Sequence, residues 1–284
     1  MIEVLAAGPL TTVQDIGRPG LAHLGVGTSG AADRAALALA NRLVGNAEEA
    51  AGLEVTLGGL KLRMATPATV AITGAPCPLR VRDRPAALNS PVAVRAGEQV
   101  EMGPPAWGVR TYLAVRGGLA VDPVLGSRST DLLAGLGPPV LAAGQRLPVG
   151  ELFDRLPIVD VAPVPGPPIA VVLRVLPGPR DDWFGPGGLR VLGGEPYLVA
   201  PDSDRVGLRL QGHPLERVRD GELPSEGMVE GALQVPPDGQ PVLLLADHPV
   251  TGGYPVIGVV PPADIPLAAQ ARPGQGIRFR VVTG

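Results

Sequence analysis

Glycine and proline are unusually dense in this chain, and they restrict its fold more than any other feature of the sequence. The 284 residues include 40 glycines and 34 prolines, together about a quarter of the chain. Both residues interrupt long helices, because glycine costs backbone entropy and proline lacks an amide hydrogen. Disordered chains can have a similar content, but hydrophobic residues make up 45% of this sequence, and disordered chains lack that apolar content. The sequence therefore predicts a mainly β fold with few helices, built from many short strands that end at glycine or proline turns.

Several segments have the apolar and β-branched composition of strands. They cover residues 2–5, 60–64, 69–73, 92–94, 99–102, 110–115, 171–176, 207–210, 242–245, 256–260 and 277–282. Residues 11–20 are predicted to be a polar, turn-prone stretch, because Gly17, Pro19 and Gly20 lie close together in it.

One helix is predicted over residues 31–44, with Ser29 as its N-cap and Gly45 and Asn46 as its stop. The apolar stripe of this helix consists of Ala36, Leu39, Ala40 and Leu43.

The composition changes after Phe153, and residues 157–168 contain five prolines, which is typical of a linker or an extended crossover. We therefore predict two β-barrel-like halves, residues 1–160 with the helix and residues 161–284.

Charge and motifs exclude several classes of function. The net charge is −3 and no basic run occurs, so no nucleic-acid partner is predicted. No apolar stretch of 18 residues and no signal-like start are present, which predicts a cytoplasmic chain without a membrane partner. The single cysteine, Cys77, excludes an internal disulfide and a cysteine-based metal cluster. The only lysine, Lys61, lies in an alternating strand where it should face solvent, and no nucleotide-binding loop or GxSxG serine motif occurs.

Polar residues gather in four glycine-rich stretches, which is how loops around a ligand are often built. The first contains Gln14, Asp15, Arg18, Ser29 and Asp33. Its alternative interpretation is ordinary turn and cap chemistry, although a helix start after Ser-Gly can also bind an anion.

The second stretch is Gly126-Ser127-Arg128-Ser129-Thr130-Asp131, where hydroxyls around one arginine suit a carboxylate or phosphate. A helix cap with a surface ion pair explains the same pattern equally well. The third, Asp202-Ser203-Asp204-Arg205, is better explained as an Asx turn before a strand. The fourth runs from Asp247 to Pro255 and sets Tyr254 between two glycines and a proline, which favours the wall of a pocket.

A family resemblance extends over nearly the whole chain. In the first half it is carried by Thr11-Thr12-Val13-Gln14-Asp15, Gly17-Arg18-Pro19-Gly20, Ser29-Gly30-Ala31-Ala32-Asp33, Asn41-Arg42-Leu43-Val44-Gly45-Asn46, Leu53-Glu54-Val55-Thr56, Tyr112-Leu113-Ala114-Val115, Gly117-Gly118 and Leu125-Gly126-Ser127-Arg128-Ser129-Thr130. In the second half it is carried by Gly178-Pro179, Ser203-Asp204-Arg205, Ser225-Glu226-Gly227, Gln234-Val235-Pro236, Asp238-Gly239 and Thr251-Gly252-Gly253-Tyr254-Pro255. With these segments in this order along the sequence, the chain resembles one family. Its members are variously named the C subunit of 5-oxoprolinase, KipA, allophanate hydrolase subunit 2 and biotin-dependent carboxyltransferase.

The resemblance implies a cyclophilin-like β-barrel fold and a subunit of an ATP-dependent 5-oxoprolinase, which converts 5-oxo-L-proline to L-glutamate. The implied partners are a KipI-like homologue of the 5-oxoprolinase B subunit and a homologue of the 5-oxoprolinase A subunit, and the complex would use ATP with Mg²⁺. A chain of this kind is expected to be inactive alone.

With the polar stretches, the resemblance predicts the site residues. The predicted catalytic residues are Asp15, Arg128, His248 and Tyr254. The predicted substrate-binding residues are Gln14, Arg18, Ser29, Asp33, Ser129, Thr130, Ser203, Arg205, Glu226, Gln234, Thr251, Gly252 and Gly253, and no metal ligands are predicted. Position 248 departs from the family pattern, where arginine is usual after the aspartate, so the role of His248 stays open between an anion-binding cation and a base.

Two other functions stay open. One is the carboxyltransferase half of a biotin-dependent urea or amide carboxylase, in which biotin would lie on another chain, because Lys61 lies between leucines rather than methionines. The other is a KipA-like protein without enzymatic activity that binds a KipI-like kinase inhibitor.

Overall fold

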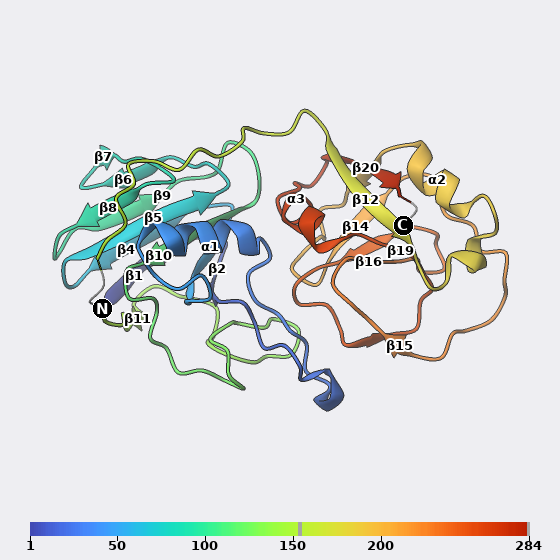
Figure 1. Cartoon of the computed structure of the whole chain (residues 1–284), viewed down its shortest axis with the longest axis horizontal. Helices are drawn as coiled ribbons and strands as arrows, with labels where there is room; N and C mark the ends of the chain where they lie inside the picture. The colour runs from blue at the N-terminus through green and yellow to red at the C-terminus, as the bar shows by residue number, and fades with distance from the viewer. Residues whose placement is uncertain (153–154, 283–284) are drawn as a thin grey trace. The chain divides into compact units, whose positions relative to one another are not determined.

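The computed structural model describes residues 1–152 and 155–282 (Figure 1). Strands dominate this part of the chain, and its α-helices are Arg34–Leu43 (α1), Gly188–Gly194 (α2) and Ile265–Ala269 (α3). Short 3₁₀ turns cover Ala22–Leu24 (η1), Asp181–Phe184 (η2) and Pro262–Asp264 (η3). The predicted mainly β fold with few helices is confirmed. None of the helices in this part of the chain combines the length and apolar character needed to span a membrane.

The chain groups into two compact units, each built from more than one stretch of sequence. Unit 1 consists of Met1–Arg18, Ser29–Asp131 and Gly135–Pro167. Unit 2 consists of Pro19–Thr28, Leu132–Ala134 and Pro168–Gly284. The division into residues 1–160 and 161–284 stays a prediction.

Unit 1 contains two antiparallel sheets. The six-stranded sheet has the order β11-β1-β4-β9-β6-β7, with strands Arg146–Leu147 (β11), Ile2–Ala7 (β1), Leu60–Met64 (β4), Gln99–Met102 (β9), Leu79–Val81 (β6) and Arg84–Pro85 (β7). The five-stranded sheet has the order β2-β3-β10-β5-β8, with strands Leu10–Gln14 (β2), Gly52–Thr56 (β3), Arg110–Val115 (β10), Ala68–Gly74 (β5) and Pro91–Val94 (β8).

Alternation along the strands places one apolar core between these sheets. In β4, Leu60, Leu62 and Met64 are buried in the same cluster as residues of the five-stranded sheet such as Leu113. The side chain of Lys61 points the other way, is 49% exposed and forms a 3.1 Å ion pair with Glu101. The prediction that Lys61 faces solvent is therefore confirmed.

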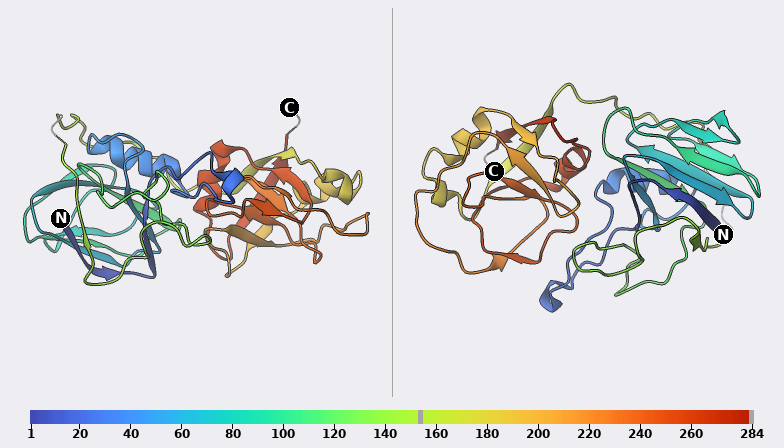
Figure 2. Two further views of the ribbon diagram at one scale, coloured as in Figure 1. Left: turned by 90° about the horizontal axis from the view of Figure 1, so that it is seen from below. Right: turned by 180° about the vertical axis from the view of Figure 1, so that it is seen from behind.

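Helix α1 packs on the five-stranded sheet, where Ala40 and Leu43 contact Ala71 and Ala114 in one buried cluster. Figure 2 shows the helix lying over the strands of unit 1. The helix is three residues shorter at its start than predicted, because Asp33 and not Ser29 is the N-cap.

The Asp33 carboxylate accepts a hydrogen bond from the Ala36 amide at 3.0 Å. The Ser29 N-cap prediction is wrong, because Ser29 has a φ of 54° and lies outside the first turn. Its hydroxyl instead donates to the Thr130 carbonyl at 3.3 Å.

The prediction for residues 11–20 was wrong in its first part, because Leu10–Gln14 form strand β2. The β-branched residues Thr11, Thr12 and Val13 pair in register with β3, as such residues fit a pleated surface. The turn that was predicted begins only after this strand, where Gly17 and Gly20 adopt φ values of 88° and 86°.

Unit 2 is a closed barrel with the strand order β12-β19-β16-β17-β14-β13-β20. Its strands are Val171–Pro177 (β12), Val256–Val259 (β19), Ala232–Gln234 (β16), Val242–Leu244 (β17), Gly207–Gln211 (β14), Tyr197–Val199 (β13) and Gly276–Val281 (β20). A separate two-stranded ribbon pairs Glu226–Gly227 (β15) with Thr251–Gly252 (β18). Helices α2 and α3 were not predicted, because α2 is rich in glycine and α3 carries a proline in its first turn, where proline is tolerated.

Candidate functional site

In unit 1, the carboxylate of Asp15 joins two of the predicted polar stretches that are more than 100 residues apart in sequence. Asp15 follows β2 and is 7% exposed. Its Oδ1 accepts from the hydroxyls of Ser127 and Ser129, both at 2.6 Å, and from the Gly17 amide at 2.7 Å. Its Oδ2 accepts from the Arg128 amide at 2.6 Å. Asp15 therefore fixes the backbone on both sides of Arg128.

Gln14 and Arg18, which precede and follow Asp15 in the sequence, also bind the loop around Arg128. The Arg18 side chain is buried, donates to the Ser129 carbonyl at 2.5 Å and lies 3.8 Å from the Asp131 carboxylate. Gln14 donates to the Thr130 carbonyl at 2.9 Å. These buried contacts to the backbone indicate that both side chains shape the loop, while Gln14 Oε1 and Arg18 Nη1 have no hydrogen-bond partner among the described residues.

Arg128 differs from its neighbours because its side chain is only partly buried. Its Nε donates to the Val121 carbonyl at 2.7 Å, and the residue lies between buried Ser127 and Ser129. The predicted catalytic role of Arg128 stays a prediction, and the residue is partly exposed.

A buried network at the start of α1 was missed by the sequence reasoning. Glu54 accepts hydrogen bonds from the Tyr112 hydroxyl at 2.7 Å and from the Ala32 amide at 2.9 Å. The Tyr112 hydroxyl accepts from the Asp33 amide at 2.8 Å, and Arg110 pairs with Glu54 at 3.4 Å. A glutamate inside the apolar strand β3 was the signal that could have indicated it, because buried carboxylates are paired or hydrogen-bonded. Burial, and then the charge of Glu54, raise the pKa of Tyr112 well above its usual value.

We expect Tyr112→Phe to destabilise unit 1 by about 1–3 kcal/mol, because it leaves the Asp33 amide and Glu54 with one partner fewer in a buried place. A raised tyrosine pKa stabilises the fold below pH about 10, and this contribution is lost as the pH rises further. The variant should therefore lose less stability at alkaline pH than the wild type. Urea titrations at pH 7 and 10.5 measure both effects.

The matched control is Tyr197→Phe, which removes only a 2.9 Å bond to the carbonyl of exposed His213. We expect it to cost about 0.5–1.5 kcal/mol. Equal losses in the two variants would contradict a special role for the Tyr112 network.

In unit 2, Arg205 and Asp247 form a buried bidentate ion pair. Their side chains are 1% and 0% exposed, and the two N–O distances are 2.9 and 3.0 Å. The Asp247 carboxylate also accepts from the Leu132 amide at 3.2 Å. The pair therefore joins the strand end at residue 247 to the segments around residues 205 and 132. Arg205 was predicted to bind substrate, and this pairing gives its guanidinium a structural partner.

The ribbon of β15 and β18 contains three of the other predicted residues of unit 2, Glu226, Thr251 and Gly252. Glu226 pairs with Arg180, whose Nε lies 3.1 Å from the Glu226 carboxylate, and this pairing lowers the pKa of Glu226. Gln234 lies against the ribbon, where a side chain on Gly252 would come within 2.4 Å of the Gln234 amide nitrogen. A larger residue at position 252 would therefore displace the Gln234 side chain.

Tyr254 is 46% exposed beyond the ribbon, next to Gly253, while Thr251 is exposed on the ribbon itself. Half-buried His248 has its Nδ1 2.8 Å from the Pro249 carbonyl. Tyr254 and Thr251 therefore remain accessible to a ligand.

Ser203 belongs to a turn, as the Asx-turn interpretation predicted. Its hydroxyl accepts from the Arg209 amide at 3.0 Å, and Asp204 accepts from the Val206 amide at 2.8 Å. This favours a structural role for Ser203.

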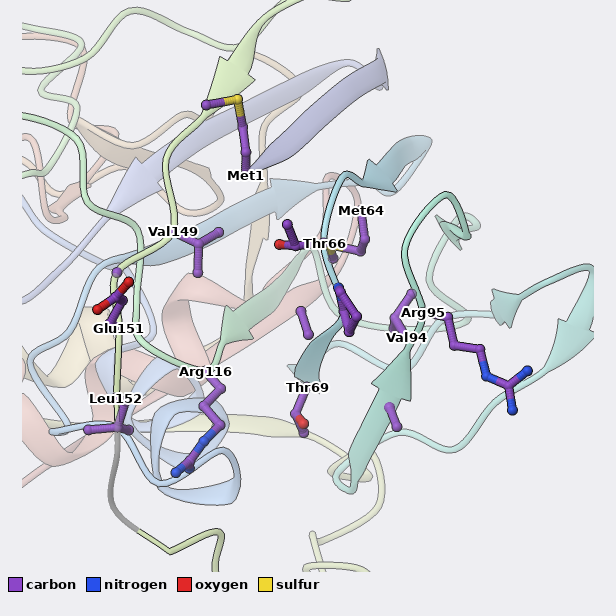
Figure 3. Close-up of a pocket in the computed structure, with 14 residues that line it drawn as sticks. Met1, Met64, Thr66, Thr69, Val94, Arg95, Arg116, Val149, Glu151 and Leu152 are labelled. Atoms are coloured by element: carbon purple, nitrogen blue, oxygen red, sulfur yellow. The ribbon is translucent and has the colours of Figure 1, made fainter.

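Among the hollows formed by residues 1–152 and 155–282, two are lined by residues of unit 1 and bear on the site. One of about 630 Å³ is lined by the ends of β4, β5 and β8 and by residues 149–152. Figure 3 shows Val149 and Glu151 on one side of it and Thr66 and Val94 on the other. None of the predicted site residues lines it. A smaller hollow of about 280 Å³ is lined by Asp15, Ile16, Arg34, Ala35, Leu37, Ala38 and Glu48. Its charged lining consists of one cation, Arg34, and two acids, Asp15 and Glu48.

Potential metal ligands do not gather in the part of the chain that the structure describes. Within residues 1–152 and 155–282, no group of three or more histidine, cysteine, aspartate or glutamate side chains could hold a metal ion.

The chain is similar to known proteins over nearly its whole length. Residues 24–281 match the model of the carboxyltransferase domain, subdomain A and B. The chain is 39% identical over 282 residues to the C subunit of 5-oxoprolinase from Escherichia coli K12, covering 98% of this chain and 90% of that protein.

Two solved structures have the same fold. The crystal structure of TTHA0988 has a TM-score of 0.88 and 38% identity, and the match covers 98% of this chain but 55% of that chain. The crystal structure of urea amidolyase from K. lactis has a TM-score of 0.92 and 31% identity, and this chain spans only 18% of it.

Proposed function

The chain belongs to the family of the carboxyltransferase domain, subdomain A and B, and from this premise we propose that it is one subunit of an ATP-dependent 5-oxoprolinase. The observation that carries the proposal is the match to the C subunit of the Escherichia coli 5-oxoprolinase, which extends over 90% of that protein. The urea amidolyase relative has a lower sequence identity, 31%, and this chain corresponds to only 18% of it. A protein of similar extent is the better guide to function than a small part of a long enzyme.

The proposed reaction converts 5-oxo-L-proline to L-glutamate in the cytoplasm. ATP transfers its γ-phosphoryl group to the lactam oxygen and leaves as ADP. Water then attacks the ring carbon, and the carbon–nitrogen bond breaks as the ring nitrogen takes up a proton, which leaves an acyl phosphate. A second water hydrolyses this acyl phosphate to the side-chain carboxylate of glutamate and free phosphate. Coupling to ATP has a chemical reason, because the phosphorylated amide carbon is a better electrophile than the stable lactam.

The residues of this chain support a shared rather than a complete active site. Partly exposed Arg128 in unit 1 can donate hydrogen bonds to an anion, and exposed Tyr254 in unit 2 can do so independently. Such donors favour negative charge that develops in a transition state. Asp15 is a positioning residue in this proposal, because four protein donors occupy its carboxylate. The proposed partners are a KipI-like homologue of the B subunit and a homologue of the A subunit, with ATP and Mg²⁺ as reactants of the complex, and this chain is inactive alone.

A second function, carboxyl transfer from carboxybiotin to urea, is favoured by the family model and by the fold shared with urea amidolyase. No covalent biotin is proposed on this chain, because Lys61 is the only lysine and pairs with Glu101. The carrier would be another chain.

The two functions make different products from a mixture of this chain with the two partner homologues. We expect ATP-dependent release of glutamate from 5-oxoproline and no carboxylation of urea when bicarbonate and a carboxylated biotin carrier are supplied. Carboxylated urea without any glutamate would favour the second function instead. Glutamate is measured by an enzyme-coupled assay and carboxylation by fixation of labelled bicarbonate.

A further inference from the structure

The outer face of the barrel in unit 2 carries arginines beside exposed aliphatic side chains. Strands β12 and β20 are parallel neighbours, with Val172 opposite Arg278 and Arg174 opposite Arg280. Figure 1 shows the two strands side by side. Because side chains alternate along a strand, these four residues all point outward, while Leu173 and Phe279 point into the core.

This face carries three arginines, and Arg174 among them is paired with the carboxylate of Asp264. Arg174 holds Asp264 through bonds of 2.6 and 3.0 Å. Arg174, and more weakly Arg280, lower the pKa of Asp264. Arg278 and Arg280 are exposed, and within residues 1–152 and 155–282 their side chains form no ion pair or hydrogen bond. Neighbouring strands lie about 5 Å apart, so the three arginines concentrate positive charge on this face, which the one carboxylate of Asp264 offsets only in part.

Exposed aliphatic side chains lie on the same face as these arginines. Val172 is 41% exposed, Leu176 on the same strand is 39% exposed, and Leu198 of neighbouring β13 is 50% exposed. Leu198 lies opposite Gly276, two residues before Arg278. Arginine is enriched at protein–protein interfaces, and covering exposed aliphatic side chains with a partner removes apolar surface from water.

The charge of this face decides between two kinds of occupant. A second copy of the chain that used the same face would place arginine against arginine, which opposes a symmetric dimer. A partner with aspartate or glutamate beside apolar residues would neutralise Arg278 and Arg280 and cover the three aliphatic side chains.

We propose that the outer β12–β20 face binds an acidic, partly apolar surface of another subunit of the same enzyme. The proposal rests on the proposed function, because that function supplies the partner. The length of the relative TTHA0988 agrees with the proposal. This chain matches 55% of TTHA0988, so the same fold occurs there within a longer chain.

The test measures binding of the purified homologue of the B subunit to the full chain. In the face variant, Arg278→Glu and Arg280→Glu are combined. The control variant combines Arg84→Glu and Arg146→Glu, which make the same change in charge at exposed positions of unit 1. Both variants should melt like the wild type, because all four side chains are exposed.

We expect the face variant to bind at least about tenfold more weakly, because it sets acid against acid across the interface, while the control binds like the wild type. Binding of the wild type should also weaken as salt rises from about 0.05 to about 0.3 M, whereas that of the face variant should change less. Unchanged binding by the face variant would overturn the proposed face and leave the proposed function intact. If the wild type itself does not bind, the proposed function fails, and the face loses its partner with it.

Discussion

Arg205→Ala is expected to lower the free energy of unfolding by about 3–5 kcal/mol, because it leaves a buried carboxylate without its cation. Asp247 is 0% exposed at its side chain, and Arg205 binds both of its oxygens. Solvent cannot replace the lost charge without opening the strand end. Urea titration followed by circular dichroism and by tryptophan fluorescence measures the change, and Trp183 reports on unit 2.

Two further variants separate the charge from the loss of packing. Arg209→Ala removes an exposed pair with Asp202, in which the side chains are 57% and 68% exposed, and should cost less than about 1 kcal/mol. Arg205→Met combined with Asp247→Leu removes both charges and should recover at least half of the loss, because an apolar replacement of a buried pair is often neutral. A double variant as unstable as Arg205→Ala would show that packing, and not the unpaired charge, determines the effect.

Asp15→Ala is expected to cost about 2–4 kcal/mol, because four donors lose their acceptor in a buried place. Two of them are the hydroxyls of Ser127 and Ser129, and two are the amides of Gly17 and Arg128. Asp15→Asn keeps one oxygen as an acceptor but brings an amide N–H₂ against a donor, so we expect a loss of about 1–2 kcal/mol.

The activity of Asp15→Asn distinguishes a positioning role from a catalytic one. A displaced Arg128 loop should raise KM for 5-oxoproline more than it lowers kcat. Both constants are measured in the reconstituted complex, under conditions in which the variant is fully folded. Ser127→Ala removes one of the four donors and serves as the matched control, with a smaller change in the same direction. Loss of kcat by several orders of magnitude at unchanged KM would instead support the catalytic role predicted for Asp15.

Local patterns made much of the fold predictable. The alternation in Leu60–Met64 and in Gln99–Met102 and the apolar residues of Arg110–Val115 identified the strands with their observed bounds. Glycine and proline turns indicated the fold class. Strand β2 was missed because Gly17 and Gly20 dominated the interpretation of a segment whose first residues are β-branched.

The partners of the site residues could not be predicted in the same way. Asp15 and Ser127 are 112 residues apart, and Arg205 and Asp247 are 42 apart, and no local pattern joins them. Ser29 and Asp33 are both suitable caps, and the choice depends on the buried Tyr112 and Glu54, which come from other strands. The sequence therefore located the polar stretches, whereas burial and pairing show that most of their side chains hold the backbone.

The most direct test of the central claim is release of glutamate from 5-oxoproline by the two partner homologues and ATP, with and without this chain. We expect release to require the chain, to saturate once the chain equals its partners in concentration, and to be absent with the chain alone. Glutamate released at the same rate without the chain would contradict its assignment to the enzyme.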